Sequence, residues 1–337
     1  MTRKIVQLNL LPVKPEITRE YMREIDGEVV VANCKTEDEV IEVARDADAI
    51  IRAGGPLNRR VLESLRKCQI ISCYAIDIDG IDLGAATEKG ICISYAIDAS
   101  TEEVSDHGMA MMLAMARKLI PYDRFVKSGW LVDDYNYVVD MGRPLIRMKE
   151  ATVGSIGMGR AARALARKTS GFGMRFLAYD PTLGGKTALE PGVELTSLER
   201  VLGESDFVHM NVPQTKDTFH LIGLEQLKMM KRTAFIINST ARASIIDETA
   251  LYKALSEGWI AGAALDILEG KPVVDNPLIK LDNVILTPHV CHISDASYRD
   301  LEERVCEDVV HFFQGQWPVL LANPKIKETV HLKSQIE

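Results

Sequence analysis

Residues 151–181 read ATVGSIGMGRAARALARKTSGFGMRFLAYDP, and several structural signals follow one another there in register. The apolar run 152–156 is typical of a buried strand, and GMGRAA at 157–162 predicts a turn from that strand into a helix. Residues 174–179 predict a second strand that ends at Asp180. The order of strand, glycine turn, helix, strand and terminal acid predicts one repeat of a doubly wound parallel sheet.

The same turn predicts a dinucleotide site. Gly157 and Gly159 allow a close approach of the backbone to a pyrophosphate, and the N-terminus of the following helix offers free N–H groups. Asp180 stands about 20 residues on, where an acidic side chain accepts hydrogen bonds from an adenosine ribose. No arginine directly follows Asp180, which favours NAD over NADP. The expected cofactor contacts from this stretch are Gly157, Met158, Gly159, Arg160, Ala161, Asp180 and Pro181.

The composition limits the class of protein and its partners. A chain of 337 residues with 47% hydrophobic content predicts two domains with buried cores, and the net charge of -8 argues against a nucleic-acid-binding surface. The six cysteines show neither CxxC nor zinc-site spacing, which favours reduced thiols in the cytoplasm and predicts no metal site. No apolar run is long enough to cross a bilayer, so we expect no membrane partner.

Strand and helix signals alternate on both sides of residues 151–181. This alternation predicts an α/β protein with two doubly wound parallel-sheet domains of the Rossmann or flavodoxin-like kind. We expect a Rossmann NAD-binding domain at residues 101–295, inserted into a discontinuous substrate domain made of residues 1–100 and 296–337.

Three polar side chains follow predicted strands, at the edge where ligands of parallel sheets bind. Arg242 follows strand 234–238, Asp266 ends strand 261–267, and His289 follows strand 283–287. Reduction of a carbonyl needs a proton donor for the developing alkoxide, which histidine supplies well, and an arginine holds a carboxylate bidentately. The pattern therefore leaves two interpretations open, an oxidoreductase that acts on a small acid and side chains that only stabilise turns or the surface.

The chain resembles the D-isomer-specific 2-hydroxyacid dehydrogenases over nearly its whole length. The resemblance rests on STEEVSDH at 100–107, VGSIGMGRAARALA at 153–166, AYDP at 178–181, NVPQTKDTFHLI at 211–222, STAR at 239–242 with Asp247, AGAALDI at 261–267, LTPH at 286–289, and the closing Gly315, Pro318 and Asn323-Pro324. The family is typically dimeric, so the resemblance implies a homodimer through the helix near residues 101–119.

The resemblance also implies a role for each matched residue. Arg242 would hold the substrate carboxylate and carbonyl, and His289 would be the acid/base. Asp266 would contact the nicotinamide carboxamide, and Asp180 the ribose. The other implied cofactor contacts are Asn211, Val212, Pro213, Thr240 and Ala241, together with Arg242 and His289.

The chain departs from the family pattern at the third catalytic position. The family has a glutamate before a proline, five positions after the aspartate that matches Asp266, and Lys271 stands there in this chain. Glu269 lies two positions earlier. The family glutamate keeps the histidine protonated for carbonyl reduction, whereas a lysine cation would disfavour the protonated imidazole. Lys271 and Glu269 are therefore both candidates for this position.

The predicted substrate loop, Ala75-Ile76-Asp77, is also unusual. Asp77 replaces a family glycine whose N–H approaches the substrate carboxylate, and a carboxylate there is unfavourable for an acid substrate. Two explanations stay open. Drift would leave Asp77 and Lys271 in solvent, with Glu269 reaching His289. A charge swap would pair Asp77 with Lys271 or Arg242 and suit a more polar, for example sugar-derived, substrate.

After the predicted catalytic histidine, Val290-Cys291-His292 replaces the small residues of the family, and His292 is a candidate substrate contact or second acid/base. We expect an NAD-dependent dehydrogenase acting on CH–OH groups. The alternatives are a non-catalytic NAD(H)-binding regulator and altered, cofactor-retaining chemistry on the same scaffold. The presence of both Arg242 and His289 favours catalysis, because a sensor needs neither.

Overall fold

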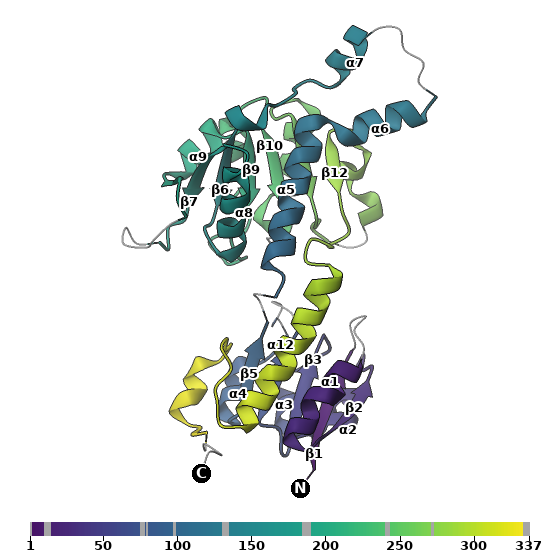
Figure 1. Cartoon of the computed structure of the whole chain (residues 1–337), viewed down its shortest axis with the longest axis vertical. Coiled ribbons are helices and arrows are strands. Elements are labelled where there is room, and N and C mark those ends of the chain that lie inside the picture. Colours follow the sequence, from purple (N-terminus) through teal and green to yellow (C-terminus); the bar gives the residue numbers. More distant parts are fainter. Residues whose placement is uncertain are drawn as a thin grey trace. The chain divides into compact units, whose positions relative to one another are not determined.

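The computed structural model describes residues 2–9, 15–74, 78, 80–96, 99–129, 135–183, 190–239, 243–270 and 273–332. The chain divides into two compact units, and Figure 1 shows the elements of each. The terminal unit comprises Met1–Ser100 and Ser294–Glu337, and the central unit comprises Thr101–Ile293. Among the described residues, no helix combines the length and apolar character that a membrane span requires.

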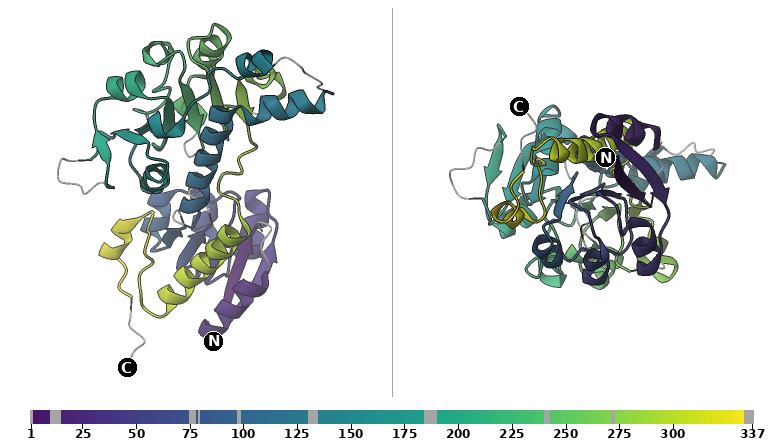
Figure 2. Two further views of the ribbon diagram at one scale, coloured as in Figure 1. Left: turned by 45° about the horizontal axis from the view of Figure 1, so that its top comes forward. Right: turned by 90° about the horizontal axis from the view of Figure 1, so that it is seen from below.

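The terminal unit contains a five-stranded parallel sheet in the order β2-β1-β3-β4-β5. One face packs against α2, α3 and α4, and the other against α1 and α12, which lie side by side (Figure 2). Its strands are β1 Arg3–Leu8, β2 Gly27–Ala32, β3 Ala49–Arg52, β4 Ile70–Cys73 and β5 Cys92–Tyr95. Its helices are α1 Pro15–Met22, α2 Glu37–Ala44, α3 Arg59–Ser64, α4 Leu83–Glu88 and α12 Asp295–Phe313, with the 3₁₀ helices η1 Arg23–Ile25 and η6 Pro324–Glu328.

The central unit contains a seven-stranded parallel sheet in the order β12-β11-β10-β9-β6-β7-β8. Helices α5 and α8 pack on one face, and α9, α10 and α11 on the other. Its strands are β6 Thr152–Ile156, β7 Arg175–Tyr179, β8 Val193–Leu195, β9 Phe207–Met210, β10 Phe235–Asn238, β11 Gly262–Leu265 and β12 Val284–Leu286. Its helices are α5 Thr101–Arg117, α6 Leu119–Lys127, α7 Tyr135–Met141, α8 Arg160–Ser170, α9 Leu198–Glu204, α10 Leu224–Met229 and α11 Glu248–Ser256, with the 3₁₀ helices η2 Met148–Glu150, η3 Ala243–Ile245, η4 Val273–Asp275 and η5 Pro277–Lys280.

The predicted fold class, with two doubly wound parallel sheets, is confirmed. All five residues of β6 are buried, as its apolar run indicates, because both faces of the central sheet are covered by helices. The strand order reverses between β6 and β9, the neighbours at the centre of the sheet. A ligand of such a sheet binds beyond the carboxyl ends of the strands at this point.

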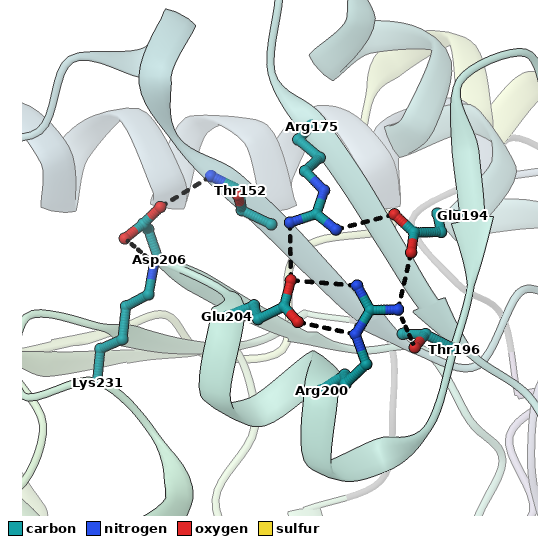
Figure 3. A network of polar contacts seen from close by, with 8 residues as sticks. All are labelled: Thr152, Arg175, Glu194, Thr196, Arg200, Glu204, Asp206 and Lys231. Atoms are coloured by element: carbon teal, nitrogen blue, oxygen red, sulfur yellow. Dashed lines mark hydrogen bonds and ion pairs between the residues drawn. The ribbon is translucent and has the colours of Figure 1, made fainter.

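A network of charged side chains joins the β7–β8 edge of the central sheet to α9 (Figure 3). Arg175 and Arg200 each contact both Glu194 and Glu204, with N–O distances of 2.8 Å in all four pairs. All four side chains are exposed, so water and salt screen each pair. The network tethers the short edge strand β8 but lies on the surface away from the strand ends that carry the predicted catalytic residues.

Candidate active site

The two glycines of the turn after β6 have different structural roles. Gly157 has a φ of 95°, and a Cβ on it would lie 2.5 Å from the carbonyl oxygen of Asn211, so only glycine fits there. Gly159 has an ordinary φ of -73° and is the N-cap residue of α8. A Cβ on Gly159 would meet no protein atom within 4 Å. Gly157 therefore packs the turn against β9, whereas Gly159 keeps the N-terminus of α8 open to an anionic ligand.

Asp180 is connected directly to this turn. Its Oδ2 accepts a hydrogen bond of 2.9 Å from the backbone N–H of Met158, and its Oδ1 accepts from the backbone and hydroxyl of Thr182. Burial alone would raise the pKa of Asp180, but the hydrogen bonds from Thr182 and Met158 outweigh it and the pKa is lowered. An ionised carboxylate at this place retains lone pairs for a ribose hydroxyl.

The segment after β9 forms the other side of the turn. The backbone N–H of Asn211 donates to Ile156 at 2.7 Å, and its side-chain amide donates to the hydroxyl of Ser155 at 2.8 Å. Val212 is half-buried beside Gly157, and Pro213 is exposed. Arg160 and Pro181 are exposed, Ala161 is half-buried and Met158 is buried. The predicted cofactor residues of these segments are thus gathered around one turn at the carboxyl edge.

Asp266 fixes the loop that carries His289. It is only 1% exposed, and its carboxylate accepts hydrogen bonds from the N–H groups of Val290 at 3.0 Å and Cys291 at 2.9 Å and from the hydroxyl of Thr287. Burial raises the pKa of Asp266, but these hydrogen bonds, with that from Thr287 the strongest, outweigh it and lower the pKa. The sequence predicted a nicotinamide contact for Asp266, and that contact stays a prediction, whereas the bonds to the loop were not foreseen.

His289 itself is exposed at a backbone φ of 60°, and its N–H donates to the carbonyl oxygen of Asp266 at 2.7 Å. The ring of His292 lies edge-on to that of His289, with 5.4 Å between the centroids. Burial, and next the proximity of His289, lower the pKa of His292. The exposed imidazole of His289 and the half-buried imidazole of His292 therefore lie together at the predicted acid/base position.

His107, which the sequence analysis quoted only as part of a motif, also contacts the loop before His289. It lies on α5, and its Nε2 is 3.0 Å from the hydroxyl of Thr287 and 3.6 Å from Asp266. The contact joins residues 180 positions apart in the chain, so no local pattern could have indicated it. The loop before His289 is thus held from both Asp266 and α5.

Glu269 contacts His220, whereas the drift explanation pairs it with His289. Both of its carboxylate oxygens lie 3.2 Å from Nε2 of His220, and its backbone N–H donates to the carboxylate of Glu248. Within the described part of the chain, no hydrogen bond or ion pair joins Glu269 to His289. This geometry gives no support to a catalytic pairing of Glu269 with His289.

Seven predicted site residues lie outside the described residues: Ala75, Ile76, Asp77, Thr240, Ala241, Arg242 and Lys271. The described residues that directly precede two of these segments are buried. Tyr74, just after β4, is buried, and Ser239, just after β10, is 2% exposed. Across the described ranges no cluster of three or more histidine, cysteine or acidic side chains is arranged to hold a metal ion.

Comparisons with known proteins agree with this geometry. Residues 109–291 match the model of the "D-isomer specific 2-hydroxyacid dehydrogenase, NAD binding domain" family. A glyoxylate reductase from Korarchaeum cryptofilum is 40% identical over 289 residues, covering 85% of this chain and 86% of that protein. One from Pyrococcus horikoshii is 35% identical and covers 97% and 96%. The structure of D-mandelate dehydrogenase from Rhodotorula graminis superposes with a TM-score of 0.85 at 26% identity, covering 96% and 98%.

The turn itself fits the cofactor of that family. A positive-φ glycine, an open helix N-terminus at Gly159 and an ionised acid at Asp180 are the parts that an adenine dinucleotide requires. The chain therefore belongs to the family of D-isomer-specific 2-hydroxyacid dehydrogenases and is an NAD-dependent oxidoreductase that acts on CH–OH groups of 2-hydroxy acids.

Proposed function

We propose that the protein interconverts a small 2-keto acid, with glyoxylate the first candidate, and its 2-hydroxy acid, with His289 as the acid/base. The observation that carries this proposal is the buried carboxylate of Asp266, which binds the two N–H groups that follow His289. This anchoring supports a fixed position for an exposed imidazole at the carboxyl edge of the sheet. The relatives named glyoxylate reductase support the choice of first substrate.

Each residue has a defined task in this proposal. When bound, NAD supplies the hydride chemistry, and the turn at 157–162 with Asp180 holds it. Arg242 binds the substrate carboxylate through a bidentate pair of hydrogen bonds. His289 donates a proton to the oxygen of the carbonyl during reduction and accepts it back during oxidation.

The first experiment follows NADH fluorescence during incubation with glyoxylate, other 2-keto acids and sugar-derived acids. We expect His289→Ala to lower kcat by about 10²–10⁴-fold, because general acid–base catalysis contributes that much, while NADH affinity stays within about twofold of the original. His331→Ala is the control, because it removes an exposed imidazole of the terminal unit, and His292→Ala tests separately the neighbouring candidate for a second acid/base. Unchanged turnover in His289→Ala would refute the proposed role and would favour a dinucleotide-sensing protein.

We further propose that Asp77 and Lys271 adjust substrate choice by a charge swap. In that case Asp77→Gly removes a carboxylate that repels an acid substrate, and kcat/KM for simple 2-keto acids rises relative to that for polar, sugar-derived acids. Lys271→Glu, which restores the family residue, should move the preference in the same direction. An unchanged ratio of kcat/KM values in both variants would mean that the two residues reflect drift.

We infer a homodimer formed through the region of α5 and α6. The methionines of α5 belong to the core of the central unit, so the face of α5 that they occupy is already covered. Helix α6, which extends from the body of the central unit in Figure 1, has no buried residue and exposes Leu119, Ile120 and Val126. An exposed apolar face of this kind favours burial against a second copy. We also propose a cytoplasmic location, which fits six buried, unpaired thiols.

A further inference from the structure

A polar side chain lies where the central sheet is otherwise apolar. His209 on β9 is 1% exposed and pairs in register with Ser155 on β6 and Ile237 on β10. The residues around it on this face, such as Phe207 and Phe235, are apolar and pack under α5 and α8. Burial lowers the pKa of His209 to about 4, so the imidazole is neutral at physiological pH. A buried neutral imidazole needs partners for both nitrogens.

Both ring nitrogens have partners that belong to the site. Nδ1 of His209 is 2.9 Å from the side-chain amide nitrogen of Asn211, which can only donate, so Nδ1 accepts and the proton sits on Nε2. Nε2 is 3.2 Å from the hydroxyl of Ser239. The amide of Asn211 also donates to Ser155, whose hydroxyl donates in turn to the carbonyl of Gly157 at 2.5 Å. A continuous chain of hydrogen bonds thus runs from Gly157 through Ser155, Asn211 and His209 to Ser239, and we call it the His209 bridge.

Helix α5 is shaped to admit this imidazole. Gly108 lies in the middle of α5, where glycine is unfavourable. A Cβ on Gly108 would lie 2.5 Å from Nε2 of His209 and 3.1 Å from the hydroxyl of Ser239. Any side chain at this position would therefore push the ring away from Ser239. The space that the imidazole of His209 requires thus explains the glycine at position 108.

We propose that His209 is a positioning residue that connects the cofactor turn to Ser239, and that Gly108 provides the space for it. One end of the His209 bridge orients Asn211 and the carbonyl of Gly157, which belong to the turn that would hold the dinucleotide. The other end holds Ser239, three positions before the proposed substrate arginine. The inference rests on the proposed role of Arg242 for this second end only, because the first end concerns NAD binding alone.

The two ends of the His209 bridge are tested by different measurements, the Kd of NADH for the cofactor turn and kcat for Ser239. His209→Leu removes both hydrogen bonds, and we expect the Kd of NADH, measured by fluorescence without substrate, to rise about tenfold, the effect of losing one or two buried hydrogen bonds. His209→Asn replaces Nδ1 but cannot reach Ser239, so it should recover most of the NADH affinity. Ser239→Ala removes only the partner of Nε2 of His209, and it should lower kcat with glyoxylate and leave the Kd of NADH unchanged. The NADH measurement does not depend on which substrate is correct.

Gly108→Ala tests the space itself. In the original chain the added methyl group should displace the ring and raise the Kd of NADH by at least fivefold, whereas in a His209→Ser background it should have little effect. Gly203→Ala is the matched control, because it also adds a methyl group to a helical glycine but its nearest neighbour would be 3.7 Å away.

The proposal is overturned if His209→Leu binds NADH as tightly as the original protein, or if Gly108→Ala is equally harmful in both backgrounds. A fall in melting temperature without a change in Kd at 25 °C would also overturn it, because His209 would then be a core residue only. Should His209→Leu not fold, Gly108→Ala and Ser239→Ala still decide the question.

Discussion

At the scale of single residues, buried polar groups organise the carboxyl edge of the central sheet. The carboxylate of Asp266 accepts hydrogen bonds from the loop that carries His289, and His209 connects the turn at Gly157 to Ser239. Both groups are 1% exposed, so each would be costly to bury without its partners. Buried residues thus hold the backbone around the exposed His289, the proposed acid/base.

The lowered pKa of His209 predicts a specific loss of stability in acid. An unfolded chain binds a proton at this histidine below about pH 6.5, whereas the folded protein resists protonation down to about 4. The contribution of His209 to stability is therefore complete above pH 6.5 and is lost as the pH falls toward 4, with a slope of up to about 1.4 kcal/mol per pH unit. Urea unfolding at pH 7, 6 and 5 should show a steeper decline for the original protein than for His209→Leu. Parallel declines would contradict the prediction.

At the scale of the strand–turn–helix element, the two glycines should respond differently to the same substitution. Gly157→Ala places a Cβ against the carbonyl of Asn211 at an unfavourable φ, so we expect loss of both stability and NAD binding. Gly159→Ala meets no protein atom, so the melting temperature should change by less than about 2 °C. The same methyl group would occupy the open end of α8, and the Kd of NAD should rise at least tenfold. Equal NAD affinity in Gly159→Ala and the original protein would show that the phosphates do not bind there.

At the scale of the whole molecule, the exposed apolar face of α6 predicts self-association. Val126 is 54% exposed and Leu119 is 55% exposed on a helix without a buried residue. Val126→Glu should convert a dimer into a monomer, as measured by sedimentation at micromolar concentration, because an unpaired carboxylate would be buried in the interface. Val319→Glu is the control, because Val319 is even more exposed but belongs to the terminal unit. A monomeric original protein, or an unaffected dimer in Val126→Glu, would contradict the homodimer.

Part of the site could be predicted because its signals are local in the chain. The positive φ at Gly157, the helix that starts at Arg160 and the acid at Asp180 lie within 24 residues, in one strand–turn–helix–strand repeat. The backbone needs glycine at such a turn whatever surrounds it. The third catalytic position is different, because the family pattern places Lys271 there, and Lys271 lies outside the described residues. The alternative, Glu269, contacts His220 in the structure, and no local pattern indicated this contact.

The sequence by itself determined the fold class, the family and the cofactor, because alternating apolar runs and a glycine turn record burial and backbone conformation residue by residue. Only the tertiary structure decided which polar groups meet. The strand order β10-β9-β6 brings Ser239, His209 and Ser155 together, and the packing of α5 adds Gly108 and His107. Contacts between residues so far apart in the chain depend on which strands become neighbours and which helix covers them, and neither is written in any single stretch of sequence.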